Sequence, residues 1–273
     1  MKVSKLVKAF LLGLASATFI TASASAQTGV ISWNYDSAGT IGGSGTATAF
    51  GDHGTGGAGD FAGVVDAQWW GNSWNGSSQN FNPTNLAYSD GTASTLDLVS
   101  TNANGTFQVV GDPGPGVDSD GKWNRNLLNG YINGGTTTAT LTQIPTAYQT
   151  SGWLLYVYVM SDVDTRVWNA QDGTGTVFYG GADPTAVSAD NPAGFSLSTF
   201  ENPVGYNTPA NYVVFSGNGA SVTVTVNFLT SDQITASFGG ITGFQLVQVP
   251  EPTTFAMLLG GAGMLMLVRR RRA

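Results

Sequence analysis

The stretch 221-SVTVTVNF-228 gives the clearest indication of how this chain folds. Every second residue is apolar and the residues between carry hydroxyl or amide groups: Val222, Val224, Val226 and Phe228 alternate with Ser221, Thr223, Thr225 and Asn227. Successive side chains of a strand point to opposite faces. The alternation therefore predicts a strand with one buried face and one solvated face.

The same period of two recurs along the chain, and no segment between residues 27 and 249 shows a sustained apolar repeat with helical spacing. Trp153–Met160 is apolar on both faces, which predicts a central strand covered on each side. Further strands are expected at Val30–Tyr35, Gly63–Gln68, Thr95–Val99, Thr106–Val110, Thr136–Thr142, Thr176–Tyr179, Asn211–Phe215 and Ile241–Val249. Many strands joined by long Gly-rich loops predict an all-β fold, a two-sheet β-sandwich of jelly-roll type.

The N-terminus has the order of features found in secretory signal peptides. Lysines precede the apolar run Ala9–Ile20, and small residues then lead into Ala24-Ser25-Ala26. This order predicts a cleaved signal peptide at residues 1–26 and a mature chain that begins at Gln27.

The C-terminus carries a second apolar run, Thr253–Val268, which ends in four arginines. As a helix, its 16 residues would span about 24 Å against a hydrocarbon core of about 30 Å. By the positive-inside rule the arginines would stay on the cytoplasmic side. We therefore expect one exported domain, residues 27–249, tethered to the membrane through a C-terminal hydrophobic helix.

Charge and composition narrow the classes of partner and chemistry. Of the 17 acidic residues, 16 lie within residues 27–249, against three of the 10 basic residues, so this domain carries a net charge of about −13. That balance argues against nucleic acid as a partner, because phosphate binding needs clustered Lys and Arg. The chain has no cysteine, which excludes thiol catalysis and disulfide support.

The C-terminal features together resemble a known sorting signal. Pro250, Glu251 and Pro252, the apolar run and the cluster Arg269, Arg270, Arg271 and Arg272 look like the PEP-CTERM signal of bacterial exported proteins. The resemblance implies that residues 250–273 are recognised and processed by an exosortase-type enzyme. It also implies a place in the cell envelope, on the outer surface or in the extracellular matrix of a Gram-negative-type bacterium, often one that makes exopolysaccharide.

A second resemblance concerns the exported domain. Its closing stretch 241-ITGFQLV-247 is similar to the end of galactose-binding-like and malectin-like sandwiches. Many members of those folds bind sugars, so the resemblance implies a polysaccharide as a candidate partner.

Tryptophans in polar surroundings are the candidates for a glycan site. A sugar site needs a flat aromatic face beside amide or carboxylate groups. The candidates are Trp70, Trp74, Asn75, Trp123 and Trp168. Core packing is the competing interpretation, and if Trp69 continues the expected strand Gly63–Gln68, the adjacent Trp69 and Trp70 point to opposite faces and at most one of them should be exposed.

Carboxylates spaced two residues apart are the candidates for structural calcium, because Ca²⁺ prefers oxygen ligands. They are Asp118, Asp120, Asp162 and Asp164. Ordinary turn chemistry explains such pairs equally well. No local motif selects a pair of carboxylates for glycoside hydrolysis, so we expect no enzyme activity. We therefore predict a carbohydrate-binding surface protein. The alternatives are a purely structural, glycosylated matrix protein and, less favoured, a polysaccharide hydrolase or lyase.

Overall fold

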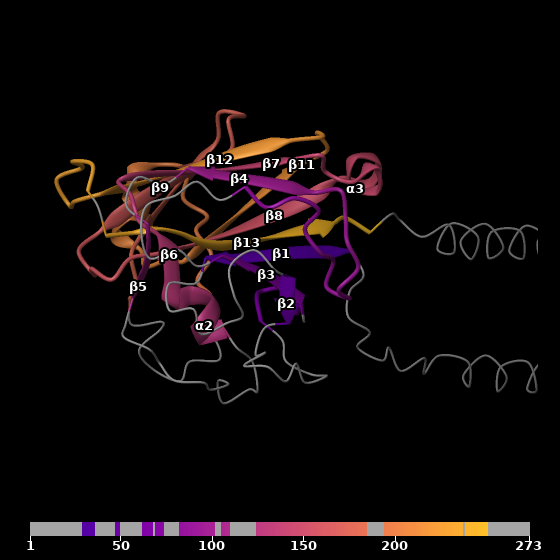
Figure 1. The fold of residues 1–273 in the computed structure, drawn as a ribbon. Coiled ribbons are helices and arrows are strands. Elements are labelled where there is room, and N and C mark those ends of the chain that lie inside the picture. The colour runs from indigo at the N-terminus through magenta and orange to yellow at the C-terminus, as the bar shows by residue number, and fades with distance from the viewer. Residues whose placement is uncertain are drawn as a thin grey trace, which may run out of the picture.

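Two β-sheets packed face to face form the body of the protein (Figure 1). The structure is a computed structural model and describes residues 29–35, 47–49, 62–67, 69–73, 82–101, 105–109, 124–184, 194–236 and 238–250. Among these residues the longest helices have six residues each. The all-β sandwich predicted from the sequence is confirmed.

The larger sheet has six strands in the order β11-β8-β13-β1-β3-β2. Its neighbours are antiparallel except β1 and β3, which run parallel. The strands are β1 (Val30–Tyr35), β2 (Ala47–Ala49), β3 (Trp69–Ser73), β8 (Trp153–Met160), β11 (Tyr212–Gly217) and β13 (Gly240–Gln248).

The smaller sheet has five antiparallel strands in the order β10-β9-β12-β7-β4. They are β4 (Asp97–Thr101), β7 (Thr136–Thr142), β9 (Val167–Gln171), β10 (Val177–Gly181) and β12 (Val222–Leu229). A separate antiparallel pair and three short helices complete the fold: β5 (Thr106–Gln108), β6 (Gly130–Ile132), α2 (Asn124–Asn129), α3 (Thr146–Ser151) and the 3-10 helix η1 (Pro203–Asn207).

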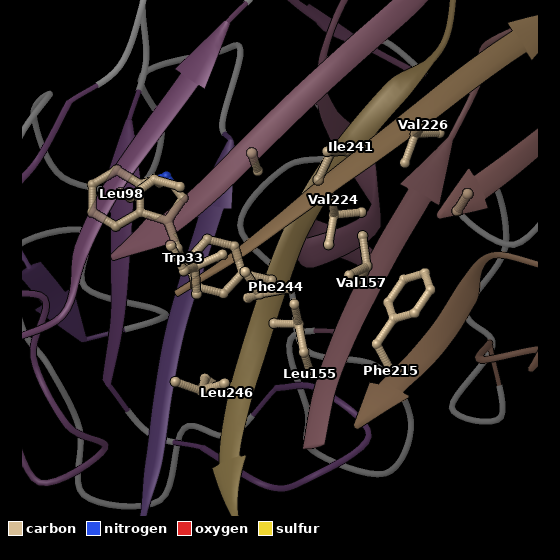
Figure 2. Packing of buried hydrophobic residues seen from close by; sticks show 14 of the residues in the cluster. Trp33, Leu98, Leu155, Val157, Phe215, Val224, Val226, Ile241, Phe244 and Leu246 are labelled. Carbon is tan, nitrogen blue, oxygen red and sulfur yellow. The ribbon is translucent and has the colours of Figure 1, made fainter. Parts of the chain in front are cut away.

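A continuous hydrophobic core fills the space between the two sheets (Figure 2). Trp33, Leu155 and Phe244 of the six-stranded sheet share this core with Leu98 and Val224 of the five-stranded sheet, and all are buried. Burying one such side chain contributes about 1.5–3 kcal/mol. Because the chain has no disulfides, the stability of the fold depends on apolar burial of this kind.

A second hydrophobic cluster covers the other face of the six-stranded sheet. It joins Trp70, Leu127, Tyr158 and Val247, and α2 lies on this face, away from the five-stranded sheet (Figure 1). The six-stranded sheet is therefore covered on both faces, which explains why all six residues of β1 are buried.

The strand predicted at Gly63–Gln68 is wrong, because residues 62–67 form a turn on this second cluster. Gly63 has a φ of +96°, and a Cβ there would lie 2.3 Å from Oε1 of Gln245. The next two backbone N–H groups donate to Oη of Tyr158 and to Oε1 of Gln245. Side chains of the sheet, not a neighbouring strand, take these hydrogen bonds.

The other strand predictions are confirmed, some with shifted ends. Val30–Tyr35, Thr136–Thr142 and Trp153–Met160 have the predicted bounds, and β8 lies between β11 and β13 as expected of a central strand. The sequence did not indicate β2, β3, β6 or β9. The jelly-roll type and the galactose-binding-like likeness stay predictions, and residues 1–26 and 251–273 lie outside the described part of the chain.

Candidate functional site

Trp70 is a core residue. Its side chain is 1% exposed, its indole N–H donates to the carbonyl oxygen of Ala67 at 3.0 Å, and its ring centroid lies 6.4 Å from that of Tyr158. No face of the ring is left for a sugar. The expectation that Trp70 binds a glycan is wrong, because its position in β3 turns the indole into the second cluster.

Trp168 is also buried, at 0% exposure. It lies in β9 and not in a polar loop, and its indole N–H donates to the carbonyl oxygen of Ala210 at 3.0 Å. The ring packs so closely on Gly180 that a Cβ there would come within 2.4 Å of it. Trp168 is therefore also withdrawn as a glycan-binding residue.

The remaining glycan candidates, Trp74, Asn75 and Trp123, lie outside the described residues and stay predictions. The same holds for Asp118 and Asp120.

Asp162 and Asp164 lie in the turn between β8 and β9, and both are exposed. Within the described ranges, no three His, Cys, Asp or Glu side chains are close enough to hold a metal ion. Calcium binding therefore stays a prediction.

One end of the sandwich carries exposed aromatic side chains beside a carboxylate. The ladder between β8 and β13 ends where Met160 pairs with Gly240, and beyond it Oγ of Ser161, the residue before Asp162, donates to the carbonyl oxygen of Phe238. Contacts described below connect Asp162 and Phe238 to β5 and β6. We name the resulting group the loop-end patch: Phe107, Tyr131, Asn133, Asp162 and Phe238.

Phe238 has a backbone conformation that is unusual for a residue with a side chain, with a φ of +72°. Two side chains hold it there: Oδ1 of Asn133 accepts from its N–H at 2.8 Å, and Oγ of Ser161 donates to its carbonyl oxygen. Such backbone strain costs about 1–3 kcal/mol and persists only where the surroundings fix it. The phenyl ring is 45% exposed, so this strain holds an aromatic side chain at the surface.

Tyr131 connects Asp162 to a second exposed ring. Its hydroxyl donates to Oδ1 of Asp162 at 3.0 Å. Burial and, secondarily, the Asp162 charge raise the pKa of Tyr131 well above its usual value, so the phenol stays a proton donor. Phe107, 40% exposed, stacks on Tyr131 with a centroid distance of 6.4 Å and an interplanar angle of 25°.

The loop-end patch therefore combines two exposed rings with a carboxylate that is oriented by one hydrogen bond. Rings can pack against apolar C–H groups, and a carboxylate oxygen can accept from a hydroxyl. Of these residues, only Asp162 was a candidate from the sequence. The others are separated by up to 131 positions along the chain, from Phe107 to Phe238, and only the sheet register brings them together.

The chain leaves the domain at the end opposite the loop-end patch. β13 starts beside the patch at Gly240 and ends at Gln248, whose N–H donates to the carbonyl oxygen of Gly29 at 2.9 Å. In Figure 1 its arrow points away from β5 and β6. Val249 follows, with its N–H bonded to the carbonyl oxygen of Gly152.

From the last residue of β13 onward, residues 248–272 match the model of the PEP-CTERM protein-sorting motif. The chain carries a PEP-CTERM sorting signal. The PEP-CTERM motif marks an exported protein of the cell surface that is processed by an exosortase. The predicted recognition residues Pro250, Glu251 and Pro252 and the arginines at 269–272 all lie within the matched range.

No curated protein and no solved structure matches the chain. The PEP-CTERM motif thus indicates how the protein is sorted. What the domain binds has to be inferred from the residues on its own surface. None of the helices in the described ranges is long and apolar enough to cross a membrane, and the apolar run of the motif lies outside those ranges.

Proposed function

We propose that this exported protein is a non-catalytic, glycan-binding β-sandwich that acts at the cell surface or in the extracellular matrix of a Gram-negative-type bacterium. The loop-end patch is its binding site. The observation that carries the proposal is the exposed ring of Phe238, which is held in a strained backbone conformation by Asn133 and by Ser161, the residue before Asp162.

The chemistry of a pyranose fits this arrangement. A sugar ring has an apolar C–H face and a rim of hydroxyls, so its binding sites pair an aromatic ring with hydrogen-bond acceptors and donors. Phe238 and Phe107 supply the rings. The oxygen of Asp162 that Tyr131 does not contact supplies an acceptor.

The position of the patch supports the same function. The sorting motif begins at Gln248, at the other end of β13. A protein held through its C-terminal tail would therefore direct the loop-end patch away from the membrane, where extracellular polysaccharide is found.

A small open patch implies weak binding at each site. A dissociation constant of about 1 mM corresponds to about −4 kcal/mol. Retention of a polysaccharide would then depend on many copies on one surface, each raising the effective concentration for the next.

The test is binding of the purified protein to an array of bacterial exopolysaccharides and of plant and algal glycans, with and without calcium. We expect Phe238→Ala and Asp162→Asn to abolish selective binding. Phe238→Gly should also abolish it while leaving the fold equally or more stable, because glycine tolerates a positive φ. Val99→Ala is the matched control, since Val99 is 44% exposed but lies on β4, opposite Thr140. Binding by Phe238→Ala equal to that of the wild type would reject the patch.

A purely structural, glycosylated matrix protein is the second candidate. The exposed face of the five-stranded sheet favours it, because hydroxyls of Thr138, Thr140, Thr223 and Thr225 lie there in adjacent strands. Hexose additions on these threonines in protein from its native host, together with no binding on the array, would support this alternative. A polysaccharide hydrolase or lyase would require turnover that disappears in one Asp→Asn variant of normal stability.

A further inference from the structure

The outward face of the five-stranded sheet is an open polar surface. Its side chains are half-buried or exposed and are mostly hydroxyls and amides: Thr136, Thr138, Thr140 and Thr142 on β7, Thr223, Thr225 and Asn227 on β12, and Asn169 and Gln171 on β9. None of these side chains is charged, and the outward face of β4 adds Asp97, Val99 and Thr101. Such a face offers both donors and acceptors to a ligand.

One row of these side chains is joined by hydrogen bonds across three strands. Oγ1 of Thr136 donates to Oδ1 of Asn227 at 2.8 Å, and Nδ2 of Asn227 donates to Oδ1 of Asn169 at 2.9 Å. Nδ2 of Asn169 then donates to the hydroxyl oxygen of Tyr206 at 3.2 Å. Every group donates in the same direction, so the hydroxyl proton of Tyr206 remains for a further acceptor.

Two aromatic rings lie where this row ends. Tyr206 packs edge-on against Tyr179 with a centroid distance of 5.2 Å and an interplanar angle of 79°. Both are half-buried, and burial raises the pKa of Tyr206, which keeps its hydroxyl protonated. A ring with a donor at its edge is again an arrangement that suits a sugar.

The other end of the row adjoins the loop-end patch. Thr136 comes three residues after Asn133, whose side chain holds the backbone of Phe238. The intervening turn is bonded to the same loop, because the N–H of Gly134 donates to the carbonyl oxygen of Gly239 at 3.2 Å. The row therefore begins beside the loop that carries Phe238 of the patch.

The row crosses β7, β12 and β9, and Tyr179, the cross-strand neighbour of Asn169, extends it to β10. With a strand spacing of about 4.8 Å, it extends about 14 Å beyond the patch. A single sugar contacts only part of such a length. An acidic polymer fits it poorly, since the domain carries about −13 with three basic residues.

We propose that the loop-end patch and the row from Thr136 to Tyr206 form one track that binds an internal segment of a neutral, linear polysaccharide. This inference rests on the proposed function: the patch holds one sugar, and the row holds the sugars that follow along the chain. The protein then recognises chain length as well as the sugar unit.

The experiment measures affinity against chain length, using full-length protein and three neutral series: glucose to cellohexaose, glucose to laminarihexaose, and N-acetylglucosamine to chitohexaose. In at least one series we expect the hexasaccharide to bind about tenfold or more tightly than the monosaccharide, which is about 1.4 kcal/mol. Tyr206→Phe removes one hydroxyl only and should reduce this advantage without changing monosaccharide affinity. Asn169→Ala, checked for folding by denaturant titration, should do the same.

The matched control is Thr223→Ala. It removes the hydrogen bond between Thr223 and Thr140, which has the same cross-strand geometry at 2.9 Å but lies in another row of the same face, and it should leave the length dependence unchanged. Equal affinity for monosaccharide and hexasaccharide in all three series overturns the track. So does an unchanged length dependence in both Tyr206→Phe and Asn169→Ala. If glycan binding on the array requires Phe238 but does not depend on chain length, the track is rejected and the proposed function stands. If the protein binds no glycan on the array, both the track and the proposed function are rejected.

Discussion

The two sheets differ in what covers them. Both faces of the six-stranded sheet are buried, one by the shared core and the other by the turn at 62–67 and α2. The five-stranded sheet buries one face only, so β7 and β12 alternate between buried and solvated residues. The same kind of side chain consequently has a different role in each sheet.

Glutamine shows this difference most directly. Gln245 on β13 is fully buried, and its amide group holds the turn at 62–67 through bonds to both the N–H and the carbonyl oxygen of Val65. Gln171 on β9 is half-buried on the polar face of the other sheet. Polar groups on the six-stranded sheet thus attach its outer cover, whereas those on the five-stranded sheet remain available to a ligand.

The largest expected effect comes from the core that both sheets share. Phe244→Ala should lower the free energy of unfolding by about 3–5 kcal/mol, because it leaves a cavity between the sheets. Denaturant titration followed by hydrogen exchange in β12 and β13 measures it. Both strands should lose hydrogen-exchange protection in one transition. Phe107→Ala, at a side chain that is 40% exposed, should lower the free energy of unfolding far less. Loss of hydrogen-exchange protection in β13 alone would contradict a single core shared by both sheets.

An intermediate effect should separate the two sheets. Gln245→Ala should cost about 1–3 kcal/mol, since it leaves partly buried backbone groups of the turn without partners. Gln171→Ala, the matched change on the other sheet, should stay within about 0.5 kcal/mol. Limited proteolysis at residues 62–67 should accelerate only in the first variant. Equal costs would show that the outer cover of the six-stranded sheet contributes little.

The smallest effect separates the two faces of a single strand. Thr137 on β7 points into the core, and its hydroxyl has no hydrogen-bond partner among the residues that the structure describes. Thr137→Val should therefore stabilise the protein by about 1 kcal/mol. Thr138→Val, on the solvated face of the same strand, should change stability by less than about 0.5 kcal/mol. Paired thermal unfolding curves suffice, and a destabilised Thr137→Val would indicate that its hydroxyl is hydrogen-bonded in solution.

The sequence predicted the five-stranded sheet better than the cover of the other sheet. The alternation in Ser221–Phe228 identified β12 to within one residue at each end, because one solvated face leaves a visible period. β9 has the same signal, with Trp168 and Ala170 buried and Asn169 and Gln171 half-buried. Because its flanking residues are polar, this short alternation did not indicate a strand.

The sites were harder to predict than the strands, for a physical reason. The turn at 62–67 takes its hydrogen bonds from side chains of β8 and β13, so no local pattern marks it. The loop-end patch likewise depends on the register between β8 and β13. The sorting signal, by contrast, is contiguous in sequence and needed no fold to be recognised.

β13 also has a mechanical consequence. It runs from the loop-end patch to the start of the sorting motif and is bonded along its length to β8 on one side and to β1 on the other. Tension between a bound polysaccharide and a tethered tail would act along this strand, perpendicular to its interstrand hydrogen bonds. These hydrogen bonds would then share the force and would have to break together. The hydrogen bonds of a peripheral strand pulled away from the sheet would instead break one at a time. We expect slow forced unfolding, so the domain would act as a stiff link between a cell and a moving polymer.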